Sequence, residues 1–207
     1  IMVPFLASIR EETGVTLSDL NLGGGYGVRY TAEDEAIDIP ARLEELVAHL
    51  KEETERLGLP MPRFLMEPGR SIVADAGMTL YTVGSVKRIP GYKQYAAVDG
   101  GMTDNPRYAL YQSRYTVYHA HKSGSLERFD VVGRCCESGD IIQPGVELPG
   151  DTCRGDLLAV CTTGAYNYSM ASNYNRLPRP AVVMLTPDRI YEAVRRETFA
   201  DLTALDL

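Results

Sequence analysis

Apolar residues recur along the chain with two different periods, and the period changes near Gly77. Between residues 40 and 58 the period is that of a helix, because one stripe of the 3.6-residue repeat holds Leu43, Leu46, Val47, Leu50 and Leu57. This stripe predicts an amphipathic helix that begins at Pro40 and ends before Gly58. His49 lies off the stripe, so we expect its side chain to be exposed.

Two short apolar runs flank this helix and predict strands at residues 17–22 and 63–66. A strand, a helical crossover and a second strand form a βαβ unit, in which the two strands lie parallel. A shorter helix is expected over residues 4–13, because Gly14 would end it. Residues 31–39 form an acidic connector that we expect to be exposed, and residues 71–77 favour one or two helical turns.

After Gly77 the apolar runs become short and rich in β-branched and aromatic residues. Such runs predict an antiparallel β domain with strands at residues 79–86, 95–99, 114–119, 129–132 and 157–162. Beyond them we predict a brief helix at 166–174, a strand at 181–186 and a helix at 188–196 with Asp188 as its N-cap. The expected fold is therefore α/β + β, with an α/β domain at residues 1–77 and a β domain at residues 78–207.

The composition of the 207 residues is that of an ordinary globular protein, with 44% hydrophobic and 24% charged residues. No apolar run approaches the ~18 residues that a membrane span needs, so we expect no membrane partner. A formal net charge of -7 argues against a nucleic-acid-binding surface. The chain opens with Ile-Met-Val-Pro inside a predicted helix and without a signal peptide, so we expect a piece of a longer, cytoplasmic protein.

The cysteines and histidines form no recognisable metal motif. No C-x-x-C spacing is present, so we expect no structural metal. His119 and His121 would share one face of a strand, a spacing that is compatible with a metal site. No third ligand is evident, so we interpret the two histidines as packed side chains or as part of an exposed strand edge. Cys153 and Cys161 are interpreted as core residues.

Two stretches carry candidate chemistry, and each follows a predicted strand. In Gly23-Gly24-Gly25-Tyr26-Gly27, glycines allow backbone N–H groups to converge on a phosphate. This loop lacks a P-loop lysine and does not fit G-x-G-x-x-G, which favours a phosphorylated cofactor over a nucleotide; a tight turn is the alternative. Glu67-Pro68-Gly69-Arg70 joins a carboxylate and a guanidinium at a strand's C-terminal end, where α/β folds carry their chemistry; a solvated turn is the alternative.

Four motifs occur in the order and approximate spacing of one family: Gly23-Gly24-Gly25, Glu67-Pro68-Gly69-Arg70, Cys136-Glu137-Ser138-Gly139-Asp140 and Gly164-Ala165-Tyr166. Over essentially its whole length the chain resembles the fold-type III pyridoxal-phosphate decarboxylases, which are alanine-racemase-like, and among them the diaminopimelate decarboxylases. The resemblance implies that residues 1–77 are the last part of a (β/α)8 TIM-type barrel that carries pyridoxal 5'-phosphate. Residues 78–207 would be the C-terminal antiparallel β domain of a homodimer with shared active sites.

The resemblance also implies which residues bind the cofactor. Gly25 would bind its phosphate through a backbone N–H, and Pro68-Gly69-Arg70 would close the same cradle. Glu67 would meet the pyridine nitrogen and keep it protonated, so that the ring accepts the electrons released when CO2 leaves. Tyr166 would hydrogen-bond the phosphate and approach the substrate, and a core aromatic residue is the alternative.

A second set of residues would bind a small amino-acid substrate. Arg107 and Tyr111, with Arg70, would hold the distal carboxylate of meso-2,6-diaminopimelate, because a guanidinium pairs with a carboxylate through two hydrogen bonds. Glu137 would bind the distal ammonium group. Outside the family, Arg107 and Tyr111 would be a solvated loop pair.

Cys136 would supply the proton that the substrate's α-carbon takes up after CO2 leaves, reaching the site from the other subunit. We expect Cys135 and Cys136 to lie in a strand, where neighbouring side chains point to opposite faces, so that only one of them faces the site. The Glu-Ser-Gly-Asp that follows implies, by the resemblance, that this one is Cys136. A small buried thiol without function is the alternative.

The implied function is the decarboxylation of meso-2,6-diaminopimelate to L-lysine and CO2, a carboxy-lyase step of lysine biosynthesis. No residue matches the family's Schiff-base lysine, so we expect that lysine to lie outside this chain and the chain alone to be inactive. A sibling decarboxylase of ornithine, arginine or carboxynorspermidine is one alternative. A non-catalytic, partner-binding relative and a nucleotide-binding domain are the others.

Overall fold

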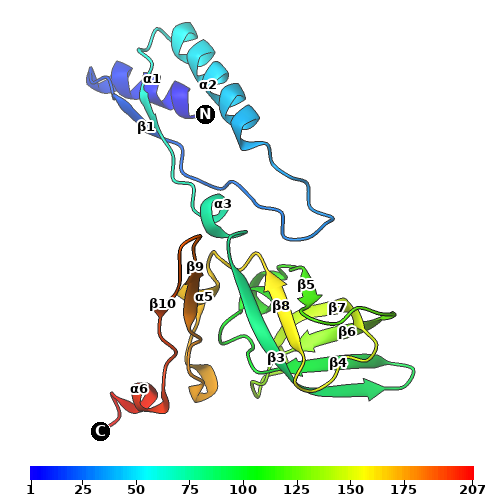
Figure 1. Ribbon diagram of the computed structural model, residues 1–207. Helices are drawn as coiled ribbons and strands as arrows, with labels where there is room; N and C mark the ends of the chain where they lie inside the picture. Colours follow the sequence, from blue (N-terminus) through cyan, green and yellow to red (C-terminus); the bar gives the residue numbers. More distant parts are fainter. The chain divides into compact units, whose positions relative to one another are not determined.

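The structure is a computed structural model that describes all of residues 1–207 (Figure 1). Its elements are, in chain order, α1 (Met2–Thr13), β1 (Asp19–Asn21), α2 (Ile39–Arg56), β2 (Arg63–Leu65), α3 (Arg70–Val73), β3 (Met78–Ile89), β4 (Lys93–Val98), α4 (Arg107–Tyr111), β5 (Val117–His119), β6 (Leu126–Val132), β7 (Ile141–Pro149), β8 (Leu157–Cys161), α5 (Asn167–Met170), η1 (Tyr174–Arg176), β9 (Val182–Leu185), β10 (Ile190–Val194) and α6 (Phe199–Thr203). None of the helices has the length and apolar character required to cross a membrane.

The chain divides into two compact units. The first unit holds Ile1–Arg29 and Glu35–Ile72, and the second holds Tyr30–Asp34 and Val73–Leu207. The sequence-based domain limits of 1–77 and 78–207 stay a prediction.

The first unit is a βαβ arrangement, which confirms the predicted crossover. β1 and β2 pair in parallel, with Leu20 opposite Phe64, and α2 connects them. Both strands have three residues and are shorter than predicted. Their apolar core consists of buried Val3, Leu6, Leu20 and Leu50, with Leu22, Leu46, Leu57, Leu59 and Phe64 packed against them.

The ends of α2 follow from its capping residues. The Asp38 carboxylate accepts a hydrogen bond from Ala41 N at 3.0 Å, and Pro40 stands in the first turn. Gly58 takes the left-handed conformation, with a φ of +59°, just past the other end. Leu50 is buried and His49 is exposed, as the stripe predicted.

The second unit is built on a six-stranded sheet of order β5-β8-β3-β4-β6-β7 (Figure 1). Its edge strands β5 and β7 approach each other, and Tyr115 N, just before β5, donates to Gln143 Oε1 in β7 at 2.9 Å. The sheet is therefore curled into a nearly closed barrel. Its buried apolar residues are Tyr81, Val83, Ala96, Val98, Tyr115, Val117, Phe129, Val131, Ile142, Val146, Leu148, Leu158 and Val160.

The prediction of a wholly antiparallel sheet is wrong at one place, because β4 and β6 pair in parallel, with Ala96 opposite Val131. A long connection that contains α4 and β5 lies between these strands, and a parallel pair requires such a crossover. β7 was not predicted, since Pro144, Gly145 and Pro149 interrupt its apolar pattern.

The C-terminal segment also differs from the prediction. The residues expected to form a helix capped by Asp188 contain β10, which pairs antiparallel with β9. Thr186 N donates to Arg189 O at 3.0 Å and closes the turn between the two strands. The last helix is α6, where Thr198 and Asp201 form a capping box. The predicted helix at 166–174 is confirmed in part, as α5.

Candidate active site

Asn21 joins the two predicted cofactor motifs of the first unit. Its Nδ2 donates a hydrogen bond to Glu67 Oε1 at 2.6 Å, and its Oδ1 accepts one from Gly23 N at 2.8 Å. Gly23 O in turn accepts from Glu67 N at 2.8 Å. The glycine loop and the Glu67 motif are therefore held together just beyond the C-terminal ends of β1 and β2.

The glycine loop lies directly against the backbone of Glu67. A Cβ at Gly24 would lie 2.2 Å from Glu67 O, which leaves no room for a side chain. Gly23 and Gly25 have φ angles of +72° and +94°, a region that favours glycine. The alternative to a phosphate-binding loop was a tight turn with positive φ angles, and Gly23 and Gly25 have such angles. At Gly24, glycine is required for a different reason, which is the close approach to Glu67 O.

The donors around this loop fit a phosphate. The N–H groups of Gly24, Gly25 and Gly69 donate to no acceptor in the chain. A Cβ built on Gly25 or Gly69 would meet no atom within 4 Å, so both sites are open. Glu67 Oε2 also accepts no hydrogen bond from the chain. Backbone donors for an anion and a free carboxylate oxygen for a ring nitrogen are the groups that pyridoxal 5'-phosphate requires.

In the second unit, α4 begins at Arg107, whose charged side chain is buried at 7% exposure. Its guanidinium carbon lies 5.3 Å from the centre of the Tyr111 ring and 5.0 Å from that of the Tyr166 ring. Cation–π attraction to both rings holds the guanidinium in place. The structure thus brings three predicted site residues together. Burial contradicts the solvated-pair alternative for Arg107, whereas Tyr111 is exposed.

Tyr166 turns the chain into α5 with a φ of +72°, which is unusual for an aromatic residue. Its side chain is 41% exposed, so the alternative of a core aromatic residue is wrong. The strained backbone directs the ring at the Arg107 guanidinium.

Buried polar groups lie near Arg107. Tyr115 OH donates a hydrogen bond to Asn167 Oδ1 at 3.4 Å. Burial raises the pKa of the Tyr115 hydroxyl, and the positive charge of Arg107 offsets part of that rise. The Tyr30 ring meets the Tyr115 ring edge-on at 5.2 Å. Arg107 Nε and Asn167 Nδ2 are buried and have no hydrogen-bond partner in the chain. The cluster therefore keeps unused donors, which an acceptor on a ligand could satisfy.

Cys135 and Cys136 lie in a bend between β6 and β7, so the prediction that they lie in a strand is wrong. Their thiols nevertheless differ, because Cys136 is exposed and Cys135 is half-buried. Burial, with the nearby Asp140 carboxylate, raises the pKa of the Cys135 thiol to about 11. Cys136 N donates to Asn175 Oδ1 at 2.9 Å, which fixes the backbone of the exposed thiol.

Glu137 carries an exposed carboxylate that neighbouring donors orient. It accepts hydrogen bonds from Gly139 N at 3.2 Å, Ser138 Oγ at 3.3 Å and Tyr174 OH at 3.5 Å. The bond from Gly139 N, followed by that from Ser138, lowers the pKa of this carboxyl group. Glu137 therefore stays ionised at neutral pH, which the predicted ammonium-binding role requires.

Sequence reasoning missed Asn21 and Asn175 as supporting residues. An asparagine two positions before a glycine favours an Asx turn, so Asn21 had a local signal. Asn175 lies 39 residues from Cys136 along the chain, and no local pattern reports such a contact.

Two interpretations made outside the motifs are corrected. His121 lies beyond β5, so it does not share a strand face with His119, whose Nδ1 accepts from Lys122 N at 2.9 Å. Cys153 is exposed and lies 3.4 Å from Lys122 Nζ, so it is not a core residue. No three His, Cys, Asp or Glu side chains are grouped to hold a metal ion.

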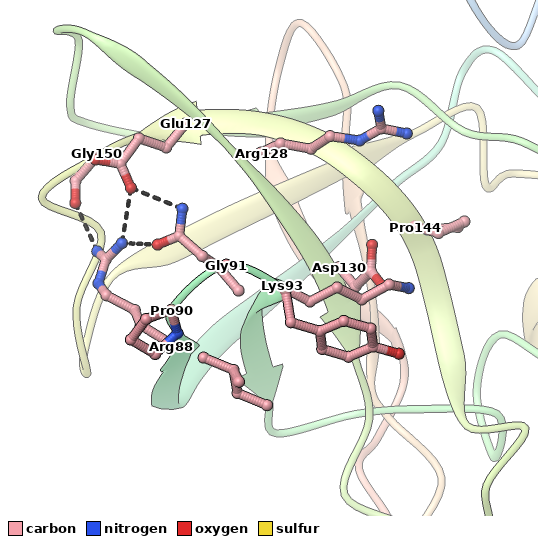
Figure 2. A pocket seen from close by; sticks show the side chains of 12 residues that line it. Arg88, Pro90, Gly91, Lys93, Glu127, Arg128, Asp130, Pro144 and Gly150 are labelled. Carbon is pink, nitrogen blue, oxygen red and sulfur yellow. Dashed lines mark hydrogen bonds and ion pairs between the residues drawn. The ribbon is translucent and has the colours of Figure 1, made fainter.

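An open hollow of about 940 Å³ lies beside the β3–β4 hairpin (Figure 2). Four of its charged groups form pairs, since Arg88 donates to Glu127 Oε2 at 2.8 Å and Lys93 Nζ donates to Asp130 Oδ2 at 2.6 Å. None of the predicted site residues lines it. The candidate chemistry therefore lies elsewhere.

Comparison with known sequences gives one family and close relatives. The family described as pyridoxal-dependent decarboxylase, C-terminal sheet domain, matches residues 16–164. The diaminopimelate decarboxylase of Bacillus subtilis (strain 168) is 50% identical over 200 residues, which are 96% of this chain and 45% of that protein. The chain spans about half the length of the curated relatives it matches.

Solved structures agree with the sequence comparison. The crystal structure of diaminopimelate decarboxylase from M. jannaschii has a TM-score of 0.91 and 32% identity, and the match covers 99% of this chain and 46% of that chain. Diaminopimelate decarboxylase from Helicobacter pylori, complexed with L-lysine, has a TM-score of 0.84 and 31% identity, with 99% and 49% covered.

Proposed function

The chain belongs to the family of pyridoxal-dependent decarboxylases, and on that premise we propose that the complete protein containing it converts meso-2,6-diaminopimelate to L-lysine and CO2. Similarity to diaminopimelate decarboxylases over 96% of the chain supports this substrate. So does the presence of the cofactor and substrate residues that the resemblance assigns to this part of the protein; the Schiff-base lysine would lie outside the chain.

The setting of Arg107 carries the proposal. This guanidinium is buried, lies against two tyrosine rings and pairs with no carboxylate of the chain. A buried cation without a counter-ion is costly, so an anionic ligand would stabilise it. The distal carboxylate of meso-2,6-diaminopimelate is such a ligand, and Arg70 and Tyr111 would contact the same group. Glu137 would bind the distal ammonium.

Pyridoxal 5'-phosphate, when bound, supplies an electron sink for the electrons released as CO2 leaves. Gly25 and Gly69 would hold its phosphate through backbone N–H groups, with Pro68 fixing the turn and Arg70 adding positive charge. Glu67 would hold a proton on the ring nitrogen with the oxygen that Asn21 leaves free. Tyr166 would hydrogen-bond the phosphate.

Cys136 would donate the proton that the α-carbon takes up after CO2 leaves. An exposed thiol on a backbone fixed by Asn175 suits this role, whereas the Cys135 thiol is partly buried and, with its pKa raised to about 11, is a weak acid.

We propose for the complete protein the same domains and the same dimer that the family resemblance implies. Residues 1–77 would be the last part of a (β/α)8 barrel, and the β domain would contribute Cys136 to the site of a second subunit in a homodimer. A cytoplasmic location stays a prediction from the sequence.

Two alternatives remain for the substrate or the role, while family membership contradicts a nucleotide-binding domain. Ornithine and arginine carry no anion at the distal end, so they would leave Arg107 without a partner. A non-catalytic relative would have no need of the Asn21-held Glu67 or of the Cys136 thiol.

Product analysis tests the proposal. The complete protein, loaded with cofactor, is incubated with carboxyl-labelled meso-2,6-diaminopimelate and, in parallel, with ornithine, arginine or carboxynorspermidine. We expect labelled CO2 and L-lysine in equal amounts from the first substrate only. A diamine or triamine product from the others would identify a sibling decarboxylase, and no CO2 from any substrate would identify the non-catalytic relative.

A further inference from the structure

Tyr115 is a buried tyrosine whose hydroxyl lies among the polar groups around Arg107. The residue is only 3% exposed, and its hydroxyl donates a hydrogen bond to Asn167 Oδ1 at 3.4 Å. Burial raises the pKa of this hydroxyl, and the charge of Arg107, together with a hydrogen bond from that guanidinium, offsets part of the rise. The Tyr115 hydroxyl therefore contacts both the Asn167 amide and the Arg107 guanidinium.

Two further contacts fix the rest of Tyr115. Its backbone N–H donates to Gln143 Oε1 in β7 at 2.9 Å. Its ring meets the Tyr30 ring edge-on, with the two centroids 5.2 Å apart and the planes at 86°. Tyr30 is held in turn, because its carbonyl oxygen accepts hydrogen bonds from Thr116 N at 3.2 Å and from Thr116 Oγ1 at 2.8 Å. The hydroxyl is therefore presented to Arg107 from a rigid support.

The contact with Asn167 also supports the Tyr166 ring. Asn167 is 3% exposed and directly follows Tyr166, whose backbone has a φ of +72°. A non-glycine backbone in this region persists only where neighbouring contacts hold it. The Tyr115 hydroxyl bonds the side chain that comes next in the chain, and the Tyr166 ring centre lies 5.0 Å from the guanidinium carbon of Arg107. One hydroxyl thus supports the guanidinium directly and, through Asn167, a ring that contacts it.

The orientation of the Arg107 guanidinium depends on few other hydrogen bonds. A guanidinium forms two hydrogen bonds with a carboxylate only when its plane is turned toward that group. Its Nε is buried without a partner in the chain, and its Nη2 lies 3.5 Å from Ser113 Oγ. Loss of the Tyr115 hydroxyl should therefore loosen the hold on the distal carboxylate.

We propose that Tyr115 is a positioning residue, whose hydroxyl fixes the Arg107 guanidinium for recognition of the distal carboxylate. This inference rests on the proposed function. Tyr115, Arg107 and the supporting Asn167 and Tyr166 all belong to one compact unit of one chain. The arrangement is therefore complete within a single subunit, whichever subunit supplies the proton donor. Tyr115 itself touches neither substrate nor cofactor in this account.

The test uses the Tyr115→Phe variant of the complete, cofactor-loaded protein, because this variant loses the hydroxyl and keeps the ring. We expect KM for meso-2,6-diaminopimelate to rise about tenfold, as for the loss of one hydrogen bond to a charged group, with kcat within about twofold of the wild-type value. The kcat/KM for D-lysine, which keeps the carboxylate that would leave and lacks the distal one, should stay unchanged. The preference for meso-2,6-diaminopimelate over D-lysine should therefore fall about tenfold. A general loss of stability would lower both kcat/KM values alike.

Chemical labelling of Arg107 gives a second readout, which does not depend on turnover. Without substrate, phenylglyoxal should modify Arg107 about tenfold faster in Tyr115→Phe than in the wild-type protein, because a guanidinium that has lost a hydrogen bond leaves its site more often. Peptide mass spectrometry measures the rate. The exposed Arg128 is the internal reference, and its rate should be equal in both proteins.

Tyr30→Phe is the matched control. It makes the same substitution in the neighbouring ring, and the Tyr30 hydroxyl is buried without a hydrogen-bond partner in the chain. We expect the substrate preference and the labelling rate of Arg107 to stay at their wild-type values. An equal fall in preference in both variants would overturn the proposal, because the packing of the rings, and not the Tyr115 hydroxyl, would then explain it.

Asn167→Ala serves if Tyr115→Phe does not fold, since it removes the acceptor that fixes the hydroxyl. We expect the preference and the labelling rate to change in the same directions, by about threefold each. A folded variant of either kind that keeps the wild-type preference, or the wild-type labelling rate of Arg107, would overturn the proposal. If the wild-type protein releases no CO2 from meso-2,6-diaminopimelate, the proposed function fails, and the labelling rates still report whether the Tyr115 hydroxyl holds Arg107.

Discussion

Asn21 holds Glu67 by one end of its amide and Gly23 by the other, at 2.6 Å and 2.8 Å. A single neutral side chain therefore sets both the orientation of the carboxylate and the start of the glycine loop. Because the Asn21 amide occupies only Oε1, the carboxylate keeps one oxygen for a ligand. The two halves of the proposed cofactor site depend on each other for this reason.

Glu67→Gln should separate cofactor binding from catalysis. The amide can still bind Asn21, but it cannot hold a proton on a pyridine nitrogen. We expect the complete protein to retain cofactor while kcat falls by about 100-fold or more. Cofactor content by absorbance and kcat by CO2 release are the measurements. Glu44→Gln, an exposed glutamate on α2, should change neither quantity. Normal turnover in Glu67→Gln would refute the assigned role.

Gly24→Ala should damage the cradle through its backbone contact. The new Cβ would lie 2.2 Å from Glu67 O, so the loop or the Glu67 motif must move. We expect a destabilisation of about 1–3 kcal/mol, typical of overpacking, together with weaker binding of the cofactor. Thermal unfolding and titration with pyridoxal 5'-phosphate measure the two effects. Gly124→Ala is the control, since a Cβ there meets no atom within 4 Å; equal behaviour of the two variants would contradict the close approach.

Glu197 should make the C-terminal hairpin sensitive to acid. The Arg179 side chain and then its backbone N–H lower the pKa of Glu197 to about 2, at hydrogen-bond distances of 2.7 Å and 2.8 Å. Because the pKa of Glu197 in the folded protein lies below the ordinary value of 4.5, the ionised carboxylate stabilises the hairpin. This contribution is fully present above pH 4.5 and is lost as the pH falls toward about 2.

Hydrogen exchange of the β9 and β10 amides, corrected for intrinsic rates, measures this loss. We expect protection to fall between pH 4.5 and 2 by an amount equivalent to ~1 kcal/mol. Glu197→Gln should remove most of the pH dependence, and Glu192→Gln on the same hairpin should preserve it. A wild-type hairpin with constant protection over that range would contradict the pairing.

The sequence predicted the first unit better than the second for a physical reason. The order of helix and strands around α2 rests on local signals, which are the Leu43 to Leu57 stripe, Pro40 and Gly58. Residues 188–196 had no such unique signal, since Ile190, Tyr191 and Val194 suit a strand, while Asp188 and the charged residues suit a helix. The turn closed by Thr186 and Arg189 decided the outcome.

The candidate site shows the same division between local and distant information. Gly25, Glu67, Arg107, Cys136 and Tyr166 were found because they lie in short motifs. The residues that orient them bond across long stretches of chain, as Tyr115 does to Asn167 and Asn175 does to Cys136. Such contacts depend on tertiary packing, and no periodicity or spacing in a single sequence encodes them.

Discrimination between meso-2,6-diaminopimelate and D-lysine tests the central claim most directly, because D-lysine keeps the carboxylate that would leave as CO2 and lacks only the distal carboxylate assigned to Arg107. The measurement is the ratio of their kcat/KM values for wild-type protein and for Arg107→Lys. We expect wild-type protein to favour meso-2,6-diaminopimelate by at least about 1,000-fold. The lysine variant, which loses the planar fork and the ring contacts, should lower that ratio about 10- to 100-fold. Equal use of both substrates by the wild-type protein, or a ratio unchanged in the variant, would contradict the account.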